Sequence, residues 1–199
     1  MVAKVVATAY GGPEVLALID EPVAPPGPGQ VLVEVRAAGV NPADYKRYGG
    51  AMGGDPAAPP PPIGLEASGV VVAVGSGAVP PSGPVAVGDE VAAFRVAGAY
   101  AAQVLVPAEA VVPKPPGLPF EAAGGLLVAG ATAVHALTVT GVGAGDTVLV
   151  HGGAGGVGHL AVQLAVAAGA RVIATGGPSS SAELRRLGAE PVTYGEGLV

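Results

Sequence analysis

The spacing of the glycines at residues 153–158 points directly to a chemistry. Gly153, Gly155 and Gly158 fit the pattern G-x-G-x-x-G. In this pattern one glycine permits a tight turn, one lets a pyrophosphate approach the backbone, and one lets a helix pack closely on a strand. Free N–H groups and the helix dipole near Gly156 and Val157 favour an anion. The spacing therefore predicts a dinucleotide site, with a merely structural turn as the alternative.

The segments around these glycines have the order needed to position them. Residues 147–152 read as an apolar strand, 156–170 as a helix and 171–175 as a second strand. A further helix (181–189) and a short strand (191–194) follow, and another helix is expected at 121–140. Strands that alternate with helices indicate a parallel α/β sheet. At helical spacing, the face of helix 156–170 expected to be buried contains Val157, Leu160, Ala161, Leu164, Ala165 and Ala168.

The first 120 residues have a different composition. They contain 19 of the 21 prolines, and proline is poorly tolerated inside helices and central strands. Strands are expected at 30–40 and 68–77, on both sides of a Gly-Asp turn in 85–94, and within 100–117. We therefore expect a compact β domain at 1–120 and a partial dinucleotide-binding domain at 121–199.

Composition excludes several classes of function. The net charge of −6 and the pI near 4.9 argue against a nucleic-acid partner. Cysteine is absent, which removes disulfides, thiol catalysis and thiolate zinc sites. Residues 122–145 carry no formal charge, but their glycines and the lack of flanking aromatic or basic clusters favour a buried helix and turn over a membrane span. With no secretory signal visible, the expected location is the cytoplasm.

The second strand predicts which nucleotide binds. NAD sites usually place an acidic residue just after this strand to hold the ribose 2′-hydroxyl. Here Gly-Gly-Pro and Ser179–Ser181 follow, and no acid occurs before Glu183. A 2′-phosphate would meet no repulsion, which favours NADP. Arg185 and Arg186 could contribute, or could simply be solvated helix residues.

Taken together, these parts resemble the medium-chain dehydrogenase/reductase superfamily, within it the zinc-free quinone oxidoreductase (zeta-crystallin-like) and enoyl-reductase branch. The resemblance is carried by "VLVEVRAAGVNPADYKRYGG", "PIGLEASGVVVAVGSG", "VGDEVAAF" and "VLVHGGAGGVG". It implies a fold of class α/β, with a GroES-like β domain followed by a partial Rossmann βαβαβ domain. The implied activity is NADPH-dependent reduction of a small molecule, a quinone or an activated alkene such as an enone.

The resemblance also bears on zinc and on catalysis. Zinc-dependent members have Cys where Asn41 stands and His where Leu65 stands, and neither residue here is a good zinc ligand. Hydrogen-bond donors must then replace a Lewis acid. Asn41 and Tyr45 are implied to line the nicotinamide and substrate pocket, where the phenol or solvent could supply a proton. The alternative makes Asn41-Pro42 a turn and Tyr45 a packing residue.

Further candidate cofactor-binding residues follow from the same motifs. Thr132 matches a threonine that contacts the cofactor, and Tyr194 a tyrosine near the adenosine ribose phosphate. Thr175, at the end of the second strand, is a further candidate. Ser181 stands where relatives often place a lysine for the 2′-phosphate, so the preference for NADP(H) is weaker than the family implies.

Family members continue well beyond the third Rossmann strand, whereas this sequence stops at Val199. The resemblance therefore implies truncation at the C-terminus. Half of a doubly wound sheet leaves an open strand edge and uncovered apolar helix faces. We expect a homo-oligomer or a missing C-terminal partner. The alternative function is a non-catalytic binding or assembly module with half a nucleotide site.

Overall fold

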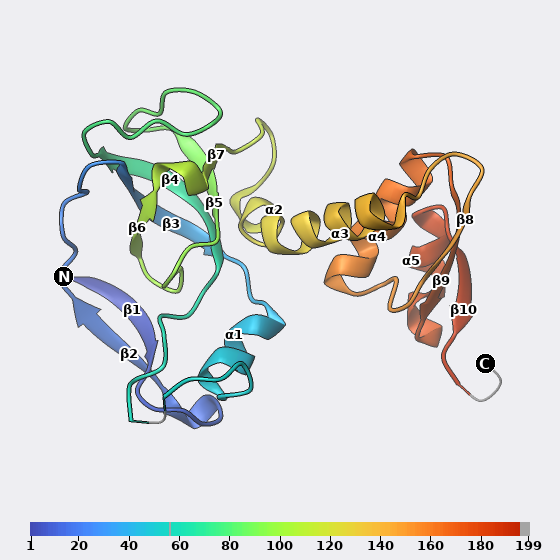
Figure 1. Cartoon of the computed structure of the whole chain (residues 1–199), viewed down its shortest axis with the longest axis horizontal. Coiled ribbons are helices and arrows are strands. Elements are labelled where there is room, and N and C mark those ends of the chain that lie inside the picture. Colours follow the sequence, from blue (N-terminus) through green and yellow to red (C-terminus); the bar gives the residue numbers. More distant parts are fainter. Residues whose placement is uncertain (56, 196–199) are drawn as a thin grey trace. The chain divides into compact units, whose positions relative to one another are not determined.

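The structure, a computed structural model, describes residues 1–55 and 57–195 (Figure 1). The chain divides into two units, Met1–Val128 and Ala129–Val199. This division falls inside helix α3 (Leu127–Thr140), a few residues after the boundary expected from the sequence. Each unit has its own buried cluster, built mainly from valine, alanine and leucine side chains.

A five-stranded antiparallel sheet forms the centre of the first unit, in the order β6-β3-β4-β5-β7. Apolar and polar residues alternate along β3, which buries Val31 and Val33 in the core. With few aromatic residues available, small branched side chains fill that core. The strands are β3 (Gln30–Ala38), β4 (Glu66–Val74), β5 (Glu90–Phe94), β6 (Gln103–Pro107) and β7 (Val111–Pro113).

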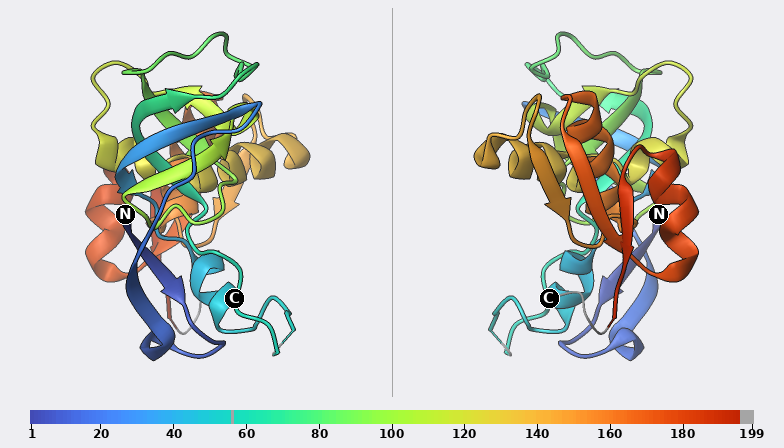
Figure 2. Two further views of the ribbon diagram at one scale, coloured as in Figure 1. Left: turned by 90° about the vertical axis from the view of Figure 1, so that its left-hand side faces the viewer. Right: turned by 90° about the vertical axis from the view of Figure 1, so that its right-hand side faces the viewer.

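An antiparallel hairpin and short helices complete the first unit. The hairpin pairs β1 (Val2–Ala7) with β2 (Leu16–Glu21), and a smaller apolar cluster of Ala7, Tyr48 and Ile63 lies beside it. The left-hand view of Figure 2 shows the hairpin and α1 at the lower end of this unit. The helices are α1 (Pro42–Tyr48), α2 (Phe120–Gly124) and the 3₁₀ turns η1 (Pro13–Val15) and η2 (Ala108–Ala110).

Local structure differs from the sequence-based expectation at three places in this unit. Pro42 occupies the first turn of α1, where a proline loses no hydrogen bond, so a helix forms where one of the two interpretations placed a turn. Residues 85–89 form no strand before β5, because Gly88 has φ +96° and Asp89 accepts a hydrogen bond from Ala86. The helix expected at 121–140 is interrupted: α2 ends at Gly124 and α3 begins three residues later, at Leu127.

The second unit contains a parallel three-stranded sheet in the order β10-β9-β8. Strand, helix, strand, helix and strand follow one another along the chain, which confirms the predicted partial Rossmann topology. The right-hand view of Figure 2 turns this sheet toward the viewer. Besides α3, its elements are β8 (Thr147–Val150), α4 (Gly156–Ala167), β9 (Arg171–Gly176), η3 (Pro178–Ser180), α5 (Ser181–Arg186) and β10 (Glu190–Thr193).

The apolar face of α4 is only partly covered. Ala161, Val162 and Ala165 are buried, but Val157 and Leu164 of the expected face are each 39% exposed. Among the described residues, β8 pairs with β9 alone, so its outer edge is open beside the exposed Leu149. Within the same part of the chain, none of the helices combines the length and apolar character required to cross a bilayer.

Candidate functional site

The glycine turn connects the carboxyl end of β8 to α4. Gly152 has φ +67°, a left-handed conformation that favours glycine. The N–H of Gly153 donates to the carbonyl of Thr175 at 2.8 Å, and the N–H of Gly155 donates to the carbonyl of Gly152 at 2.9 Å. These bonds fix the loop against β9 before the helix begins at Gly156.

Each glycine of the turn meets different surroundings. A Cβ added at Gly153 would lie 2.7 Å from the Cβ of Ala174, so this residue allows close packing on β9. A Cβ at Gly158 would lie 2.8 Å from the carbonyl carbon of Gly152 and would collide with its oxygen. A Cβ at Gly156 would meet no atom within 4 Å. The tight turn, expected at Gly153 as the first glycine of the pattern, is thus formed by Gly152. At Gly156, in contrast, there is open space.

The first turn of α4 provides backbone donors beside that open space. By helix geometry, the N–H groups of Gly156, Val157 and Gly158 have no acceptor inside the helix, and the helix dipole adds positive charge there. A hollow of about 440 Å³ adjoins the turn. It is lined by Ala136, Leu137, Thr140, Val148, Leu149, Val150, His151, Gly152, Gly155, Gly156, Val157, Gly158 and Ala161. This combination of donors and space is able to receive an anion.

Thr175 supports the turn from behind. Its side chain is fully buried, and its hydroxyl accepts a hydrogen bond from the N–H of Gly152 at 3.0 Å. The hydroxyl also lies 3.3 Å from Nδ1 of His151. The Thr175 hydroxyl thus holds the loop in place, and its part in cofactor binding stays a prediction.

The other candidate cofactor residues of the second unit lie at varying distances from the turn. The hydroxyl of Tyr194 would be 3.8 Å from a Cβ at Gly152, so this half-exposed tyrosine borders the turn. Ser181 begins α5, in the segment that follows β9. Thr132 is exposed on α3, one helical turn before Ala136, the nearest residue of α3 that lines the hollow.

The two arginines of α5 differ in their partners. Arg186 forms a bidentate ion pair with Glu183, with Nε–Oε2 at 2.7 Å and Nη2–Oε1 at 2.6 Å. This bond raises the pKa of Arg186 and lowers the pKa of Glu183. Oε1 of Glu183 also lies 3.5 Å from Nε2 of His159. Glu183 is thus already paired, and Arg185 is exposed and has no ion pair within residues 1–55 and 57–195.

In the first unit, Asn41 and Tyr45 belong to α1. Asn41 precedes the helix and is 9% exposed, whereas Tyr45 is 54% exposed within its unit. The side-chain Nδ2 of Asn41 donates to Oε1 of Glu66 at 2.9 Å. Asn41 therefore has a buried carboxylate as its partner, a residue that sequence reasoning did not identify.

Glu66 links two elements of the first unit. It is 1% exposed, and its second oxygen, Oε2, accepts a hydrogen bond from the N–H of Val128 at 2.8 Å. Val128 lies in the first turn of α3, where a negative charge is stabilised by the helix dipole. A Cβ at Gly39 would collide with the Glu66 carboxylate, so a glycine is required there.

A second buried carboxylate fixes the base of α1. Oδ2 of Asp44 accepts hydrogen bonds from the Asn41 N–H at 2.8 Å and the Tyr100 hydroxyl at 2.9 Å, and Oδ1 accepts one from the Gly64 N–H at 3.1 Å. Burial and this bond to Asp44 raise the pKa of Tyr100. Acidic residues inside the otherwise uncharged stretches "NPAD" and "IGLEASG" are the signal that could have revealed both carboxylates.

Across residues 1–55 and 57–195, no three His, Asp or Glu side chains gather into a group that could hold a metal ion. Asn41 and Leu65, the positions compared with zinc ligands, carry an amide bound to Glu66 and an aliphatic side chain. These two residues therefore provide hydrogen bonds and apolar surface at this point.

Comparison with known proteins places these features in context. Residues 27–116 match the family described as the alcohol dehydrogenase GroES-like domain. The quinone oxidoreductase of Pseudomonas aeruginosa is 38% identical over 190 residues, covering 94% of this chain and 56% of that protein. The phthioceranic/hydroxyphthioceranic acid synthase of Mycobacterium tuberculosis is 40% identical over 177 residues, covering 84% of this chain and 8% of the synthase.

Solved structures agree with these matches. Mycobacterial Rv1454c complexed with NADPH has a TM-score of 0.86 at 38% identity, covering 98% of this chain and 59% of that one. CurK enoyl reductase has a TM-score of 0.88 at 28% identity, covering 99% of this chain and 60% of that one. The chain thus spans about half the length of the curated quinone oxidoreductases and about three fifths of these solved chains.

Proposed function

Because the chain belongs to the medium-chain dehydrogenase/reductase superfamily, we propose that it serves the zinc-independent reduction of a quinone or an activated alkene by NADPH. The observation that carries this proposal is the glycine turn, where the first three N–H groups of α4 have no acceptor inside the helix and a Cβ at Gly156 would meet open space. The NADPH complex of a relative with the same fold supports the same cofactor. The names quinone oxidoreductase and enoyl reductase among the relatives support the two substrate classes.

Each part of the cofactor has candidate partners on this chain. The amides of Gly156, Val157 and Gly158 would hold the diphosphate, with Gly155 allowing its approach. Tyr194 borders the same turn and is proposed for the adenosine side, together with Ser181. When bound, NADPH supplies the hydride for the reduction.

The preference for NADP(H) rests on the charges that follow β9. The residues from Gly177 to Ser181 carry no carboxylate, and the first acid, Glu183, is already paired with Arg186. A 2′-phosphate would therefore meet little repulsion, and the serine hydroxyls could donate to it. Arg185, exposed on α5, is the available cation in this segment.

The chemistry proposed for the substrate side rests on α1. The Tyr45 hydroxyl is reachable from solvent and could donate a proton to the developing enolate or quinol oxygen, as solvent also could. Asn41 would line the same pocket, with its amide oriented by Glu66. Without a Lewis acid at this position, such donors would stabilise the oxygen that gains negative charge.

A second candidate function is a binding or assembly module without catalysis. The open edge of β8 and the exposed Leu149, Val157 and Leu164 favour association with another polypeptide, either a second copy or a partner that contributes the rest of the sheet. In this alternative the glycine turn would still bind nucleotide, but turnover would be absent.

The two functions can be separated by titrating the chain with NADPH and following nicotinamide fluorescence, then assaying turnover with a simple quinone and an enone. Gly156→Asp places a carboxylate against the diphosphate and should weaken binding by roughly tenfold or more relative to Gly156→Asn, its uncharged control. Equal affinity of the two variants would refute the assignment of the turn. Binding without turnover would favour the module, and no binding by the wild type would refute both functions.

A further inference from the structure

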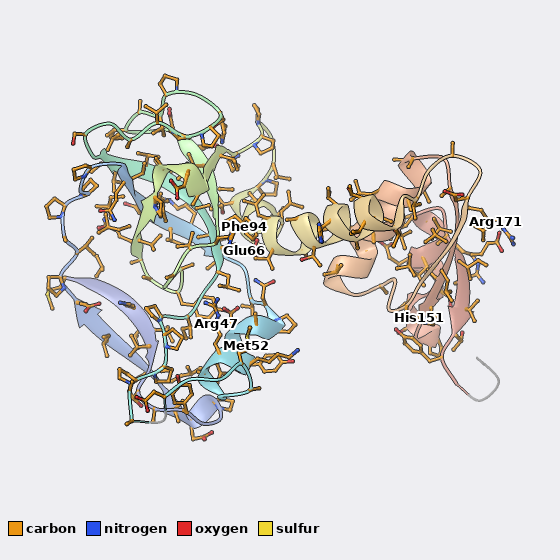
Figure 3. All side chains as sticks on the ribbon, in the orientation of Figure 1. Arg47, Met52, Glu66, Phe94, His151 and Arg171 are labelled. Atoms are coloured by element: carbon orange, nitrogen blue, oxygen red, sulfur yellow. The ribbon has the colours of Figure 1, made fainter. Side chains whose placement is uncertain are left out.

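Two arginines and an aromatic ring line one hollow in the first unit. The hollow, called here the arginine hollow, measures about 480 Å³ and is lined by Arg47, Leu65, Phe94, Arg95, Val96, Ala97 and Val128. Arg47 comes from α1, and Phe94 lies opposite Glu66 in the β4–β5 ladder. Figure 3 shows the Arg47, Glu66 and Phe94 side chains in this region. The hollow therefore adjoins the Asn41–Glu66–Val128 link of the candidate site.

Neither of these two arginines forms an ion pair with the part of the chain that the structure describes. Arg36, Arg171 and Arg186 all form ion pairs, but among the described residues neither Arg47 nor Arg95 has a carboxylate within 4.0 Å. The buried carboxylates of Asp44 and Glu66 are occupied by other donors. Glu109 lines an adjoining hollow together with Arg95 but forms no ion pair with it.

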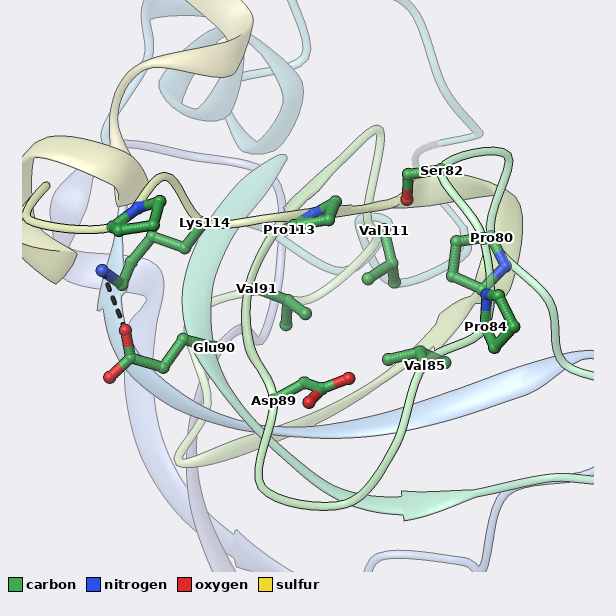
Figure 4. A pocket seen from close by; sticks show the side chains of 12 residues that line it. Pro80, Ser82, Pro84, Val85, Asp89, Glu90, Val91, Val111, Pro113 and Lys114 are labelled. Carbon is green, nitrogen blue, oxygen red and sulfur yellow. Dashed lines mark ion pairs between the residues drawn. The ribbon is translucent and has the colours of Figure 1, made fainter.

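Another hollow of the same unit contains a cation that does have partners within the protein. It measures about 390 Å³ and contains Lys114, whose ammonium lies 2.9 Å from the Glu90 carboxylate and donates to the Leu118 carbonyl at 2.7 Å (Figure 4). That cation is satisfied within the protein. The cations of the arginine hollow, in contrast, remain available to a ligand.

The backbone conformation of Arg95 is the second observation. Its φ is +60°, and among residues 1–55 and 57–195 it is the only residue other than glycine with a positive φ. Such strain persists only where the surroundings impose it, and it clusters at functional sites. Here Val96 is buried, and its N–H donates to the Leu65 carbonyl at 3.0 Å, so the chain turns sharply and leaves Arg95 exposed at the hollow.

We propose that the arginine hollow selects substrates that carry an anionic group, such as a carboxylate, sulfonate or phosphate, on the quinone or alkene. This inference rests on the proposed function, since it defines the substrate class of the same site. Guanidinium groups bind such oxygens with short, charge-assisted hydrogen bonds. Leu65 and Phe94, both partly exposed, offer apolar surface for the ring or the alkene beside them.

Calorimetric titration with two matched, unreactive quinones tests the proposal. Anthraquinone-2-sulfonate should bind the wild-type chain roughly tenfold more tightly than 2-(hydroxymethyl)anthraquinone, and raising the salt concentration should reduce the difference. The double variant Arg47→Gln/Arg95→Gln should lose this preference and bind both compounds alike. Arg36→Gln, which removes an exposed arginine already paired with Glu34, should keep it.

Two further measurements separate the outcomes. Arg95→Gly relieves the positive φ, so it should fold at least as stably as the wild type while binding the sulfonate more weakly. NADPH affinity should be unchanged in the double variant. If the double variant loses as much affinity for NADPH as for the sulfonate, the arginines serve the cofactor and the proposal is overturned. Equal binding of both quinones by the wild type would also overturn it. If NADPH fails to bind at all, the proposed function fails, while the preference for the sulfonate is still measured.

Discussion

The carboxylate of Glu66 fixes the orientation of the Asn41 side-chain amide, with 2.9 Å between Oε1 and Nδ2. An ionised carboxylate only accepts hydrogen bonds, so Asn41 must turn its NH₂ group toward Glu66. The second N–H of the same NH₂ group is then the donor that Asn41 can present elsewhere. If Asn41 contacts a ligand as proposed, it would recognise an acceptor such as a carbonyl or enolate oxygen.

Replacing Glu66 tests the importance of this buried link. Glu66→Gln removes the charge, and its own NH₂ group cannot accept from Asn41 while its oxygen bonds Val128. We expect the free energy of unfolding to fall by about 1–3 kcal/mol, as measured by urea denaturation. Glu109→Gln, an exposed control, should change it by less than about 0.5 kcal/mol. Equal stability of the two variants would contradict the structural role given to Glu66.

Gly158 and Gly156 provide a matched pair within one turn of α4. Gly158→Ala drives a Cβ into the Gly152 carbonyl and should destabilise the chain by about 1–3 kcal/mol and weaken NADPH binding. Gly156→Ala has free space and should be neutral or stabilising by up to about 1 kcal/mol. Thermal or urea unfolding compares the stabilities of the two variants directly. Equal stability would show that the turn does not pack as described here.

Thr175 should act through the loop that it supports. Thr175→Val keeps the shape but leaves the Gly152 N–H without its acceptor, so both stability and NADPH affinity should decrease, the stability by about 1–3 kcal/mol. Thr175→Ser retains the hydroxyl and should restore most of the affinity in fluorescence titration. If valine and serine behave alike, the hydroxyl does not hold the turn.

The raised pKa of Tyr100 predicts that the protein loses stability at alkaline pH. This pKa is raised in the folded protein, so above pH 10 the unfolded chain releases this proton first, and the free energy of unfolding falls as the pH rises. Below pH 10 the contribution is fully present. Tyr100→Phe should be less stable than the wild type at pH 8, because Asp44 loses a donor, and the difference should shrink at pH 11. Urea unfolding of both proteins at the two pH values measures this, and a constant difference would argue against a coupled Tyr100–Asp44 pair.

Periodicity and turn residues were sufficient to predict the strands and helices of the second unit, because each is encoded by a local pattern. Local patterns failed where a single residue admits two conformations: Pro42 suits a turn or the first turn of a helix, and Gly124 suits a helix or its end. The face of α4 was misjudged in part, because Val157 and Leu164 are only partly covered and remain 39% exposed.

The candidate site was predictable only in its local part. The glycine turn is contiguous in sequence, so its position and chemistry could be inferred from spacing. The bond from Asn41 to Glu66 joins residues 25 positions apart, and the one from Val128 to Glu66 joins residues 62 apart. Such pairings depend on how β4, α1 and α3 assemble, which no motif records. The burial of the Thr175 side chain likewise depends on how β9 packs, so the local sequence does not predict it.

If another polypeptide pairs with the open outer edge of β8, nucleotide affinity and association become thermodynamically linked. This strand leads directly through His151 into the glycine turn, so a polypeptide hydrogen-bonded along it would also restrain the loop proposed to hold the diphosphate. If association tightens that loop, NADPH strengthens the association by the same factor. The apparent Kd for nucleotide would then depend on the protein concentration, and dilution alone would weaken nucleotide binding.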